Sequence, residues 1–348
     1  MIKAILREME LRSDYIKDQV IHTIYFGGGT PSLLDKQELE MILNKIRKLF
    51  KVADDAEITL EANPDDLADI STLEMLRSVG INRLSIGIQS FFDEHLAWMN
   101  RAHNAEHAEQ AVKLAQQAGF KNITVDLIYG IPKMTLRQWE ENINRVLGLN
   151  IQHISAYCLT VEDQTVLSKM VRDGKVKEAP DEDIENQVNM LVEKLAEKGF
   201  ERYEISNFAL PGMESRHNSA YWGGVWYLGL GPSAHSYNGS AREWNVANNA
   251  IYVKQVSAGE GFSDTEPIDE TTAYNEYIMT RLRTSKGIDA NLVKKQFSID
   301  LEKDFEEEIG FLIEDQEATF ENGILKLTHT GRFFADGIAA SLFLERGE

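Results

Sequence analysis

The stretch His22-Thr-Ile-Tyr-Phe-Gly-Gly-Gly-Thr-Pro-Ser32 is a short apolar run that ends in three consecutive glycines and a proline. Ile24, Tyr25 and Phe26 are β-branched or aromatic and show no helical period, so we expect a strand here. The three glycines lack a Cβ, so their backbone groups can approach a small molecule closely and adopt positive φ. The stretch therefore predicts a buried strand that presents bare backbone to a ligand.

Two common glycine signatures do not fit this loop. A dinucleotide-binding fingerprint requires another glycine where Ser32 stands, and a phosphate-binding P-loop requires a Gly-Lys pair that is absent. Taken alone, the loop would be interpreted as a glycine turn between a strand and a helix. Its interpretation as a binding loop depends on the rest of the chain.

Composition limits the class of protein. The chain has 348 residues, of which 43% are hydrophobic and 26% charged, as expected for one large or two modest globular domains. The formal charge of -20 argues against nucleic acid as a partner. The single cysteine, Cys158, excludes an internal disulfide and a metal site built on several thiolates of this chain. We expect no membrane span and no signal peptide, hence a cytoplasmic protein.

The first half of the chain alternates strands and helices. After a helix over residues 1–18 and the glycine-loop strand, helices are expected at 35–50, from Ser71 to Gly80, at 105–119 and from Thr135. Further strands are expected at 57–63, 83–89, 122–129 and 153–161. Five such steps predict a parallel sheet or a partial (β/α) barrel, in which ligands bind beyond the carboxyl ends of the strands.

The pattern changes after residue 165. Residues 166–265 predict a connecting α+β segment with a helix at 180–199, a strand at 202–206 and aromatic, glycine-rich loops. Residues 266–348 predict three helices, a hairpin turned at Asn322-Gly323 and a last helix, which is a winged-helix-like outline. Because acidic residues crowd this region, packing or partner contact is a better interpretation than DNA binding.

Seven motifs, in this order and spacing, resemble those of radical S-adenosylmethionine (SAM) proteins related to oxygen-independent coproporphyrinogen III oxidase, and in particular the HemW-type heme chaperones. Each is weak alone, but together they are specific and cover nearly the whole chain. They are Phe26-Gly-Gly-Gly-Thr-Pro-Ser32, Glu61-Ala-Asn-Pro64, Arg83-Leu-Ser-Ile-Gly-Ile-Gln-Ser90, Asn100-Arg101, Asp126-Leu-Ile-Tyr-Gly-Ile-Pro132, Tyr203-Glu-Ile-Ser-Asn-Phe208 and His217-Asn-Ser-Ala-Tyr-Trp222.

The resemblance implies a partial (β/α) barrel that binds SAM across its strand ends. The residues that would contact SAM are Gly28, Gly29, Thr30, Glu61, Gln89, Arg101 and Asp126. Arg101 offers the fork that a carboxylate prefers, and the acidic side chains suit hydroxyls and an ammonium group. Without the resemblance, each polar residue would be interpreted as ordinary hydrogen bonding at a strand end, and Arg101 as half of a surface ion pair.

One family feature is not found in this sequence. The family carries a Cys-x-x-x-Cys-x-x-Cys loop after the first barrel strand to bind a [4Fe-4S] cluster, and this chain begins downstream of that point. We therefore expect the first strand and the cluster ligands to be missing, as after a late start site or a cut, and no reductive SAM cleavage by these residues. Cys158 matches no cluster position and is expected to be a small buried residue.

The motif His217-Asn-Ser-Ala-Tyr-Trp222 resembles the segment that distinguishes heme chaperones from true coproporphyrinogen oxidases. The resemblance implies that His217 is an axial ligand of heme iron and that Tyr221 and Trp222 form flat walls for the porphyrin. The alternative is a loop histidine bonded to backbone.

Three functions follow from these patterns. The first is a heme chaperone that binds heme or porphyrin and passes it to an acceptor protein. The second is an enzyme, oxygen-independent coproporphyrinogen III oxidase, against which the motif at His217 argues. The third is a cluster-free interaction protein on the same scaffold, which only the missing cysteines support. Whether the chain is an enzyme is left undecided.

Overall fold

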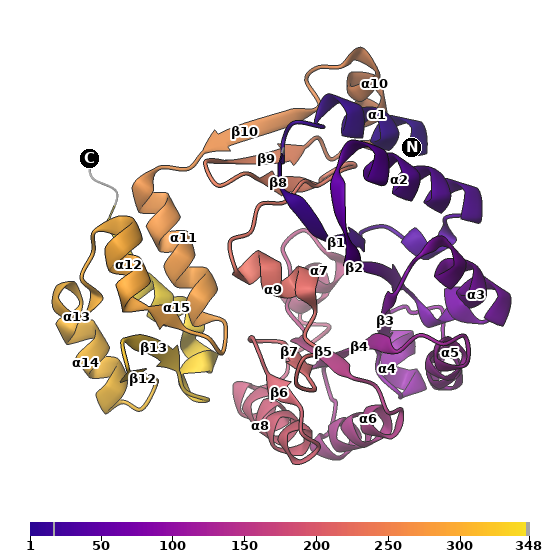
Figure 1. Ribbon diagram of the computed structural model, residues 1–348. Helices are drawn as coiled ribbons and strands as arrows, with labels where there is room; N and C mark the ends of the chain where they lie inside the picture. Colours follow the sequence, from indigo (N-terminus) through magenta and orange to yellow (C-terminus); the bar gives the residue numbers. More distant parts are fainter. Residues whose placement is uncertain (17, 346–348) are drawn as a thin grey trace.

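The computed structural model describes residues 1–16 and 18–345 (Figure 1). Its largest sheet has seven strands in the order β1-β2-β3-β4-β5-β7-β6, of which β1 to β5 run parallel and the last two antiparallel. The strands are β1 (Val20–Phe26), β2 (Lys51–Ala62), β3 (Arg83–Gln89), β4 (Asn122–Tyr129), β5 (His153–Cys158), β7 (Asn207–Ala209) and β6 (Glu201–Arg202). The expected partial barrel is therefore confirmed.

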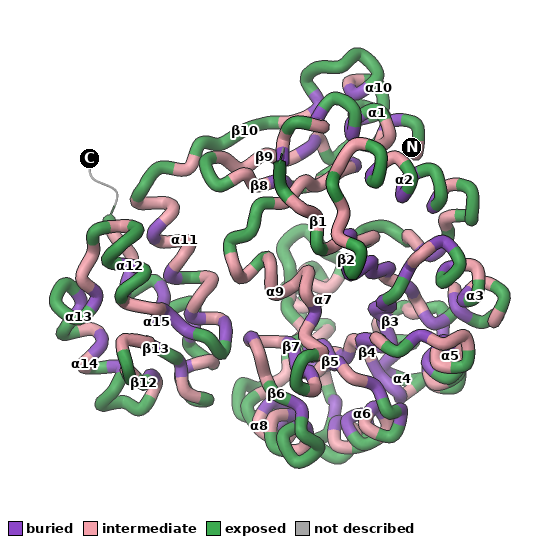
Figure 2. Tube along the Cα trace, viewed as in Figure 1, coloured by how far each residue is buried: buried purple, intermediate pink, exposed green. Residues whose placement is uncertain are grey.

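The helices that connect these strands cover the outer face of the curved sheet (Figure 1). They are α2 (Lys36–Leu49), α3 (Ile70–Val79), α4 (Asp93–Trp98), α5 (Ala105–Gln117), α6 (Leu136–Gly148) and α8 (Asp181–Glu197), with the short 3-10 helices η1 (Pro31–Leu33) and η2 (Pro64–Leu67). The short helix α7 (Val166–Arg172), which follows β5, has no buried residue. Leu60, Leu84, Val125 and Ile154 are fully buried between the sheet and these helices. This buried layer shows in Figure 2 and is the main core of the protein.

Most of the helix caps expected from the sequence are present in the structure. Asp35 with Glu38 and Thr135 with Gln138 form reciprocal capping boxes, and Gly80 ends α3 in the left-handed conformation. The cap of α3 is Asp69, whose carboxylate accepts the backbone N–H of Ser71, so the expected start at Ser71 was wrong.

The strand expected at 202–206 is interrupted. Glu204 is almost fully buried and its carboxylate accepts the backbone N–H of Ser206 at 3.2 Å and the side-chain amide of Asn207. These bonds fold the chain back on itself, so that β6 pairs antiparallel with β7. The parallel sheet thereby ends on a hairpin edge.

Residues 216–267 contain α9 (Arg216–Trp222), β8 (His235–Tyr237), β9 (Ala241–Asn245), α10 (Asn249–Ala258) and β10 (Ser263–Pro267), the three strands forming a separate antiparallel sheet. The first helix, α1 (Ile2–Leu11), packs against α10 and is shorter than the expected 1–18. The carboxylate of Glu8, fully buried, accepts the N–H of Gly231 (2.9 Å), the amide of Asn245 (2.7 Å) and the hydroxyl of Tyr252. One carboxylate thus fastens α1 to this part of the chain.

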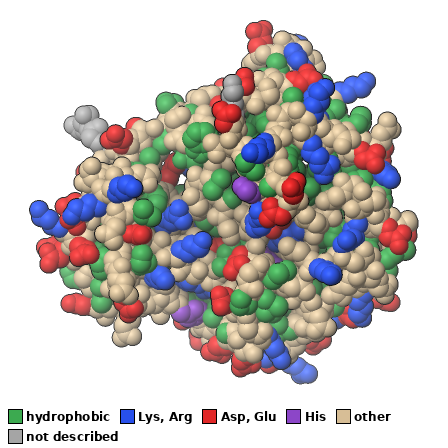
Figure 3. All heavy atoms as spheres, in the orientation of Figure 1, with side chains coloured by type: hydrophobic (Ala, Val, Ile, Leu, Met, Phe, Trp, Pro, Cys, Tyr) green, Lys and Arg blue, Asp and Glu red, His purple; other side chains and the backbone are tan. Residues whose placement is uncertain are grey.

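The C-terminal region is a smaller α+β unit with its own apolar core. It contains α11 (Glu270–Leu282), β11 (Ile288–Asp289), α12 (Ala290–Phe297), α13 (Leu301–Asp304), α14 (Glu306–Glu314), β12 (Ala318–Glu321), β13 (Ile324–Leu327), η3 (Gly331–Phe334) and α15 (Ala335–Ser341). The expected hairpin at Asn322-Gly323 joins β12 to β13. Figure 3 shows acidic side chains along this edge of the molecule, where α14 begins with three glutamates.

Among the described residues, no helix combines the length and the apolar character needed to cross a membrane.

Candidate functional site

The concave face of the seven-stranded sheet is polar. Side chains alternate between the two faces of a strand, so each strand that buries apolar residues against the outer helices turns its polar residues inward. The register places Thr59 beside Arg83, Thr124 beside His153 and Asp126 beside Ser155 across neighbouring strands. The inside of the half-barrel is therefore a continuous polar surface that ends at the carboxyl ends of β1 to β4.

The glycine loop lies at one side of this mouth. Gly28 and Gly29 have φ of +69° and +65°, and no heavy atom lies within 4 Å of where a Cβ would stand. Glu61, at the end of β2, accepts the N–H of Gly28 at 3.1 Å and the hydroxyl of Tyr25 at 2.6 Å. Thr30 is exposed at the start of η1. The loop thus offers open backbone next to a fixed carboxylate.

Gln89 and Arg101 meet at the end of β3. A Cβ on Gly87 would lie 2.9 Å from the Gln89 amide nitrogen and 3.2 Å from an Arg101 guanidinium nitrogen, so both side chains rest on that glycine. Arg101 donates to Asn63 Oδ1 at 2.9 Å and to the Gly87 carbonyl at 3.2 Å. Within the described residues it forms no ion pair, which leaves its charge available to a ligand.

Asp126 lies on β4, between these groups. Its carboxylate oxygens are each 3.4 Å from the Ser85 hydroxyl. Burial raises the pKa of Asp126 to about 6; a hydrogen bond from Ser155 opposes this shift, and the nearby Glu61 carboxylate adds to it. Asp126 and Glu61 therefore lie near each other on the concave face, and the residues expected to contact SAM lie at or near the carboxyl ends of β1 to β4.

His217 lies on α9, against the concave side of β1. Its Nδ1 is 3.1 Å from the hydroxyl of Thr23, and its ring stacks on Tyr25 with centroids 4.6 Å apart and planes at 17°. Burial, with a smaller effect of the Arg83 cation, lowers the pKa of His217 to about 4, so the imidazole is neutral at pH 7. No described residue forms a hydrogen bond with its Nε2. The alternative interpretation of His217 as a loop histidine bonded to backbone is wrong, because the residue lies in α9 and its ring bonds the Thr23 side chain. The backbone N–H of His217 donates separately to the Glu57 carboxylate.

The two aromatic residues of the same motif point in different directions. Tyr221 packs edge-on against His217, with centroids 5.6 Å apart, and is 45% exposed. Trp222 instead has the Arg283 guanidinium 5.5 Å from its ring centroid, and its indole nitrogen is buried without a partner among the described residues. Of the two residues expected to form walls for the porphyrin, Tyr221 thus lies beside His217, whereas the ring of Trp222 packs near Arg283.

Behind this site lies a set of buried polar residues that sequence reasoning missed. Tyr203 O–H bonds His153 Nε2 at 2.8 Å and accepts the Asn218 amide at 3.1 Å, while His153 Nδ1 is 3.0 Å from the Thr124 hydroxyl. Arg83 also donates to Thr124 and approaches Glu57 at 3.9 Å. The alternation of polar residues along β2 to β5 was the signal that could have revealed this lining.

The residues of this chain do not fit a [4Fe-4S] cluster. Such a cluster is held by several cysteine thiolates, and the sequence has one cysteine. Cys158 is partly buried at the end of β5, where burial raises the pKa of its thiol. Among the residues that the structure describes, no group of three or more His, Cys, Asp or Glu side chains could hold a metal ion.

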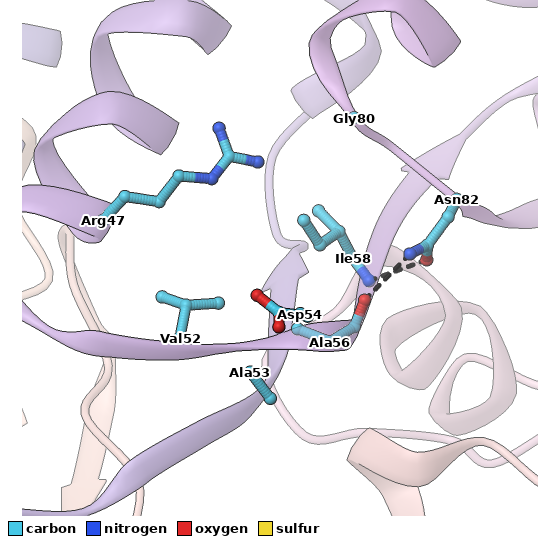
Figure 4. A pocket seen from close by; sticks show the side chains of 8 residues that line it. All are labelled: Arg47, Val52, Ala53, Asp54, Ala56, Ile58, Gly80 and Asn82. Atoms are coloured by element: carbon cyan, nitrogen blue, oxygen red, sulfur yellow. Dashed lines mark hydrogen bonds between the residues drawn. The ribbon is translucent and has the colours of Figure 1, made fainter.

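A cavity of about 330 Å³ lies away from this mouth, at the amino-terminal side of β2 and β3 (Figure 4). Its wall includes Asn82, which accepts the Ile58 N–H and donates to the Ala56 carbonyl, both at 2.8 Å. Asn82 thus ties the chain before β3 to β2. In barrel folds this end serves stability rather than ligand binding.

Comparison with known proteins identifies the family. A model of the radical SAM superfamily matches residues 3–146, and a model of the HemN C-terminal domain matches residues 268–334. The chain is 32% identical over 320 residues to the heme chaperone HemW of Bacillus subtilis (91% of this chain, 84% of the relative) and 32% identical over 343 residues to that of Mycobacterium tuberculosis (97% and 85%).

Among solved structures, coproporphyrinogen III oxidase (HemN) from Escherichia coli superposes with a TM-score of 0.82 at 22% identity, covering 97% of this chain and 81% of that one. This likeness concerns the fold alone. The extent and identity of the sequence matches show that the chain belongs to the HemW family of radical SAM proteins.

Proposed function

We propose that this protein is a heme chaperone, which binds heme through His217 and transfers it to an acceptor protein in the cytoplasm. The curated relatives that carry the name heme chaperone support this over coproporphyrinogen oxidation. The likeness to the oxidase, at 22% identity, concerns only the fold. Under this proposal residues 1–165 are the SAM barrel, 166–265 carry the heme ligand, and 266–348 form the C-terminal domain.

The observation that carries the proposal is the state of the His217 ring. A heme-iron ligand must be a neutral imidazole with one nitrogen free, and its other nitrogen is usually held by a hydrogen bond. Burial lowers the pKa of His217 to about 4, and its Nδ1 lies 3.1 Å from Thr23 Oγ1. Donation from Nδ1 to Thr23 would leave the Nε2 lone pair for iron, with the exposed Tyr221 ring beside it.

The residues at the barrel mouth fit SAM, and they are the ones we propose to hold it. Glu61 and Asp126 are placed to accept hydrogen bonds from hydroxyl and ammonium groups, while Arg101 has no carboxylate partner within the described residues. Gly28, Gly29 and Thr30 leave room for close approach of a ligand to the backbone, and Gln89 adds an amide beside Arg101. When bound, SAM supplies radical chemistry in this superfamily only together with a cluster, which these residues do not fit.

Heme titration followed by the Soret band tests the proposal. We expect the wild-type chain to bind heme and His217→Ala to lose or shift the band, whereas His107→Ala, which removes an exposed histidine on α5, should behave as wild type. Heme-loaded protein should also transfer heme to apomyoglobin, used as a generic acceptor. Identical heme spectra and affinities for wild type and His217→Ala would refute the assignment of the ligand.

A further inference from the structure

Tyr25 contacts the proposed heme ligand and the proposed SAM site at the same time. Its ring stacks on the imidazole of His217 at 4.6 Å, with planes nearly parallel at 17°. Its hydroxyl donates to Glu61 Oε1 at 2.6 Å, a short bond of the charge-assisted type. One side chain therefore joins two groups that belong to different ligands.

Glu61 has few other contacts that fix its position. Its second oxygen accepts the N–H of Gly28 at 3.1 Å, in the open part of the glycine loop. A ligand that binds through Glu61 or the backbone of Gly28 must share or replace these bonds. Any such change at the carboxylate reaches the Tyr25 hydroxyl directly.

The His217 ring is in turn oriented mainly by β1. Thr23 and Tyr25 are two residues apart, so they lie on the same face of the strand, where one bonds Nδ1 and the other stacks on the ring. The Tyr25 ring also lies close to the backbone of Gly27, since a Cβ there would lie 2.5 Å from a ring carbon of Tyr25. A shift of Tyr25 would therefore be passed to the imidazole rather than absorbed by free space.

We propose that Tyr25 is a positioning residue that transmits the state of the Glu61 carboxylate to the heme ligand His217, so that the SAM site and heme ligation are coupled. The inference rests on the proposed function, because it takes His217 as the heme ligand. It implies that heme affinity is highest while Glu61 holds the Tyr25 hydroxyl, and falls when that bond is lost.

A double-mutant cycle on heme affinity tests the coupling. Glu61→Ala and Tyr25→Phe should each weaken heme binding by roughly threefold to tenfold, the range expected for coupling through packed side chains. Glu61→Ala should have no further effect in the Tyr25→Phe background, because the link is then absent. Glu61→Gln, which keeps an acceptor for the hydroxyl, should restore most of the affinity lost in Glu61→Ala.

Tyr129→Phe is the matched control, since it removes the hydroxyl of another partly buried tyrosine, on β4, that packs on Trp139. It should leave heme affinity unchanged, and circular dichroism should show that every variant is folded. Equal effects of Glu61→Ala in the wild-type and Tyr25→Phe backgrounds would overturn the coupling while leaving His217 as the ligand. Heme binding that does not depend on His217 would overturn both this inference and the proposed function.

Discussion

The carboxylate of Glu57 holds the backbone of His217: Glu57 Oε1 lies 3.0 Å from its amide nitrogen, and Oε2 lies 3.2 Å from that of Arg216. These two amides begin α9, where backbone N–H groups have no partner within the helix and favour a negative charge. Ser215 completes the cap by accepting the N–H of Asn218. A residue in the middle of β2 therefore fixes the start of the helix that carries the proposed heme ligand.

We predict that Glu57→Ala lowers the free energy of unfolding by about 3 kcal/mol, because it removes two charge-assisted hydrogen bonds and leaves the buried Arg83 unpaired. Urea denaturation measures this loss. Asp55→Ala is the control: Asp55 also pairs with Arg216, but it is 79% exposed, so its removal should cost less than about 1 kcal/mol. Equal losses for the two variants would contradict the role given to Glu57.

The two aromatic residues of α9 should differ in heme binding. Tyr221→Leu removes the exposed ring beside His217 and is expected to weaken heme binding several-fold, since aromatic contacts contribute about 1 kcal/mol each. Trp222→Phe should leave heme affinity within about twofold, because this ring packs near Arg283. Heme titrations of both variants check the prediction, and a larger loss for Trp222→Phe than for Tyr221→Leu would contradict it.

Two groups at the site should give opposite dependences of stability on pH. Burial lowers the pKa of His217 from 6.5 to about 4, so on acidification the unfolded chain takes up a proton at this residue before the folded chain does. The contribution of neutral His217 to the free energy of unfolding is therefore complete above pH 6.5 and is lost as the pH falls to 4. Burial raises the pKa of Asp126 from 3.8 to about 6, so its stabilisation is complete below pH 3.8 and lost as the pH rises to 6.

The free energy of unfolding of Asp126→Asn should therefore rise by about 2 to 3 kcal/mol relative to that of wild type as the pH rises from 4 to 6. The free energy of unfolding of His217→Ala should rise by a similar amount relative to that of wild type as the pH falls from 6.5 to 4. Urea titrations across this range measure both differences, with His107→Ala as the control for an exposed histidine. Parallel curves for wild type and Asp126→Asn would show that Asp126 has the same pKa in the folded and the unfolded chain, which would contradict the prediction.

The 348-residue chain should incorporate no [4Fe-4S] cluster on anaerobic reconstitution, because its one cysteine cannot supply the ligands. Its affinity for SAM should be lower by about a thousandfold than that of a protein in which a cluster would add to the binding, since here only side chains and backbone of the barrel would hold SAM. Iron and sulfide analysis and calorimetry measure these outcomes, and Cys158→Ser should give the same results. Micromolar SAM binding would contradict the prediction.

Much of the barrel follows from local sequence patterns. The alternation of short apolar runs with capped helices predicted the parallel strands, and Asp35 with Glu38 and Thr135 with Gln138 formed the expected capping boxes. The strand at 202–206 was wrongly predicted as continuous, because the bend depends on the burial of Glu204, which arises only when the C-terminal region packs beside it.

The site could be predicted in part. Glu61, Gln89 and Asp126 follow from their places on the parallel strands, whose carboxyl ends meet at one edge. The position of Trp222 was also available in principle: five residues from His217 on a helix, it lies roughly 140° around the axis, whereas Tyr221 lies only about 40° away. The link from Tyr25 to both Glu61 and His217 required the tertiary structure, because α9 reaches β1 from almost two hundred residues further along the chain.

The buried carboxylate of Glu8 has a consequence for how the molecule is made. Of its partners, Arg12 is only four residues away, whereas Gly231, Asn245 and Tyr252 are 223 to 244 residues further along the chain. During synthesis from the amino terminus, the three long-range hydrogen bonds of Glu8 can form only after most of the protein has left the ribosome, whereas each βα step can pack on the one before it. Contacts of such long range are slow to form. The first helix to be synthesised is thus expected to be among the last to pack in its final position.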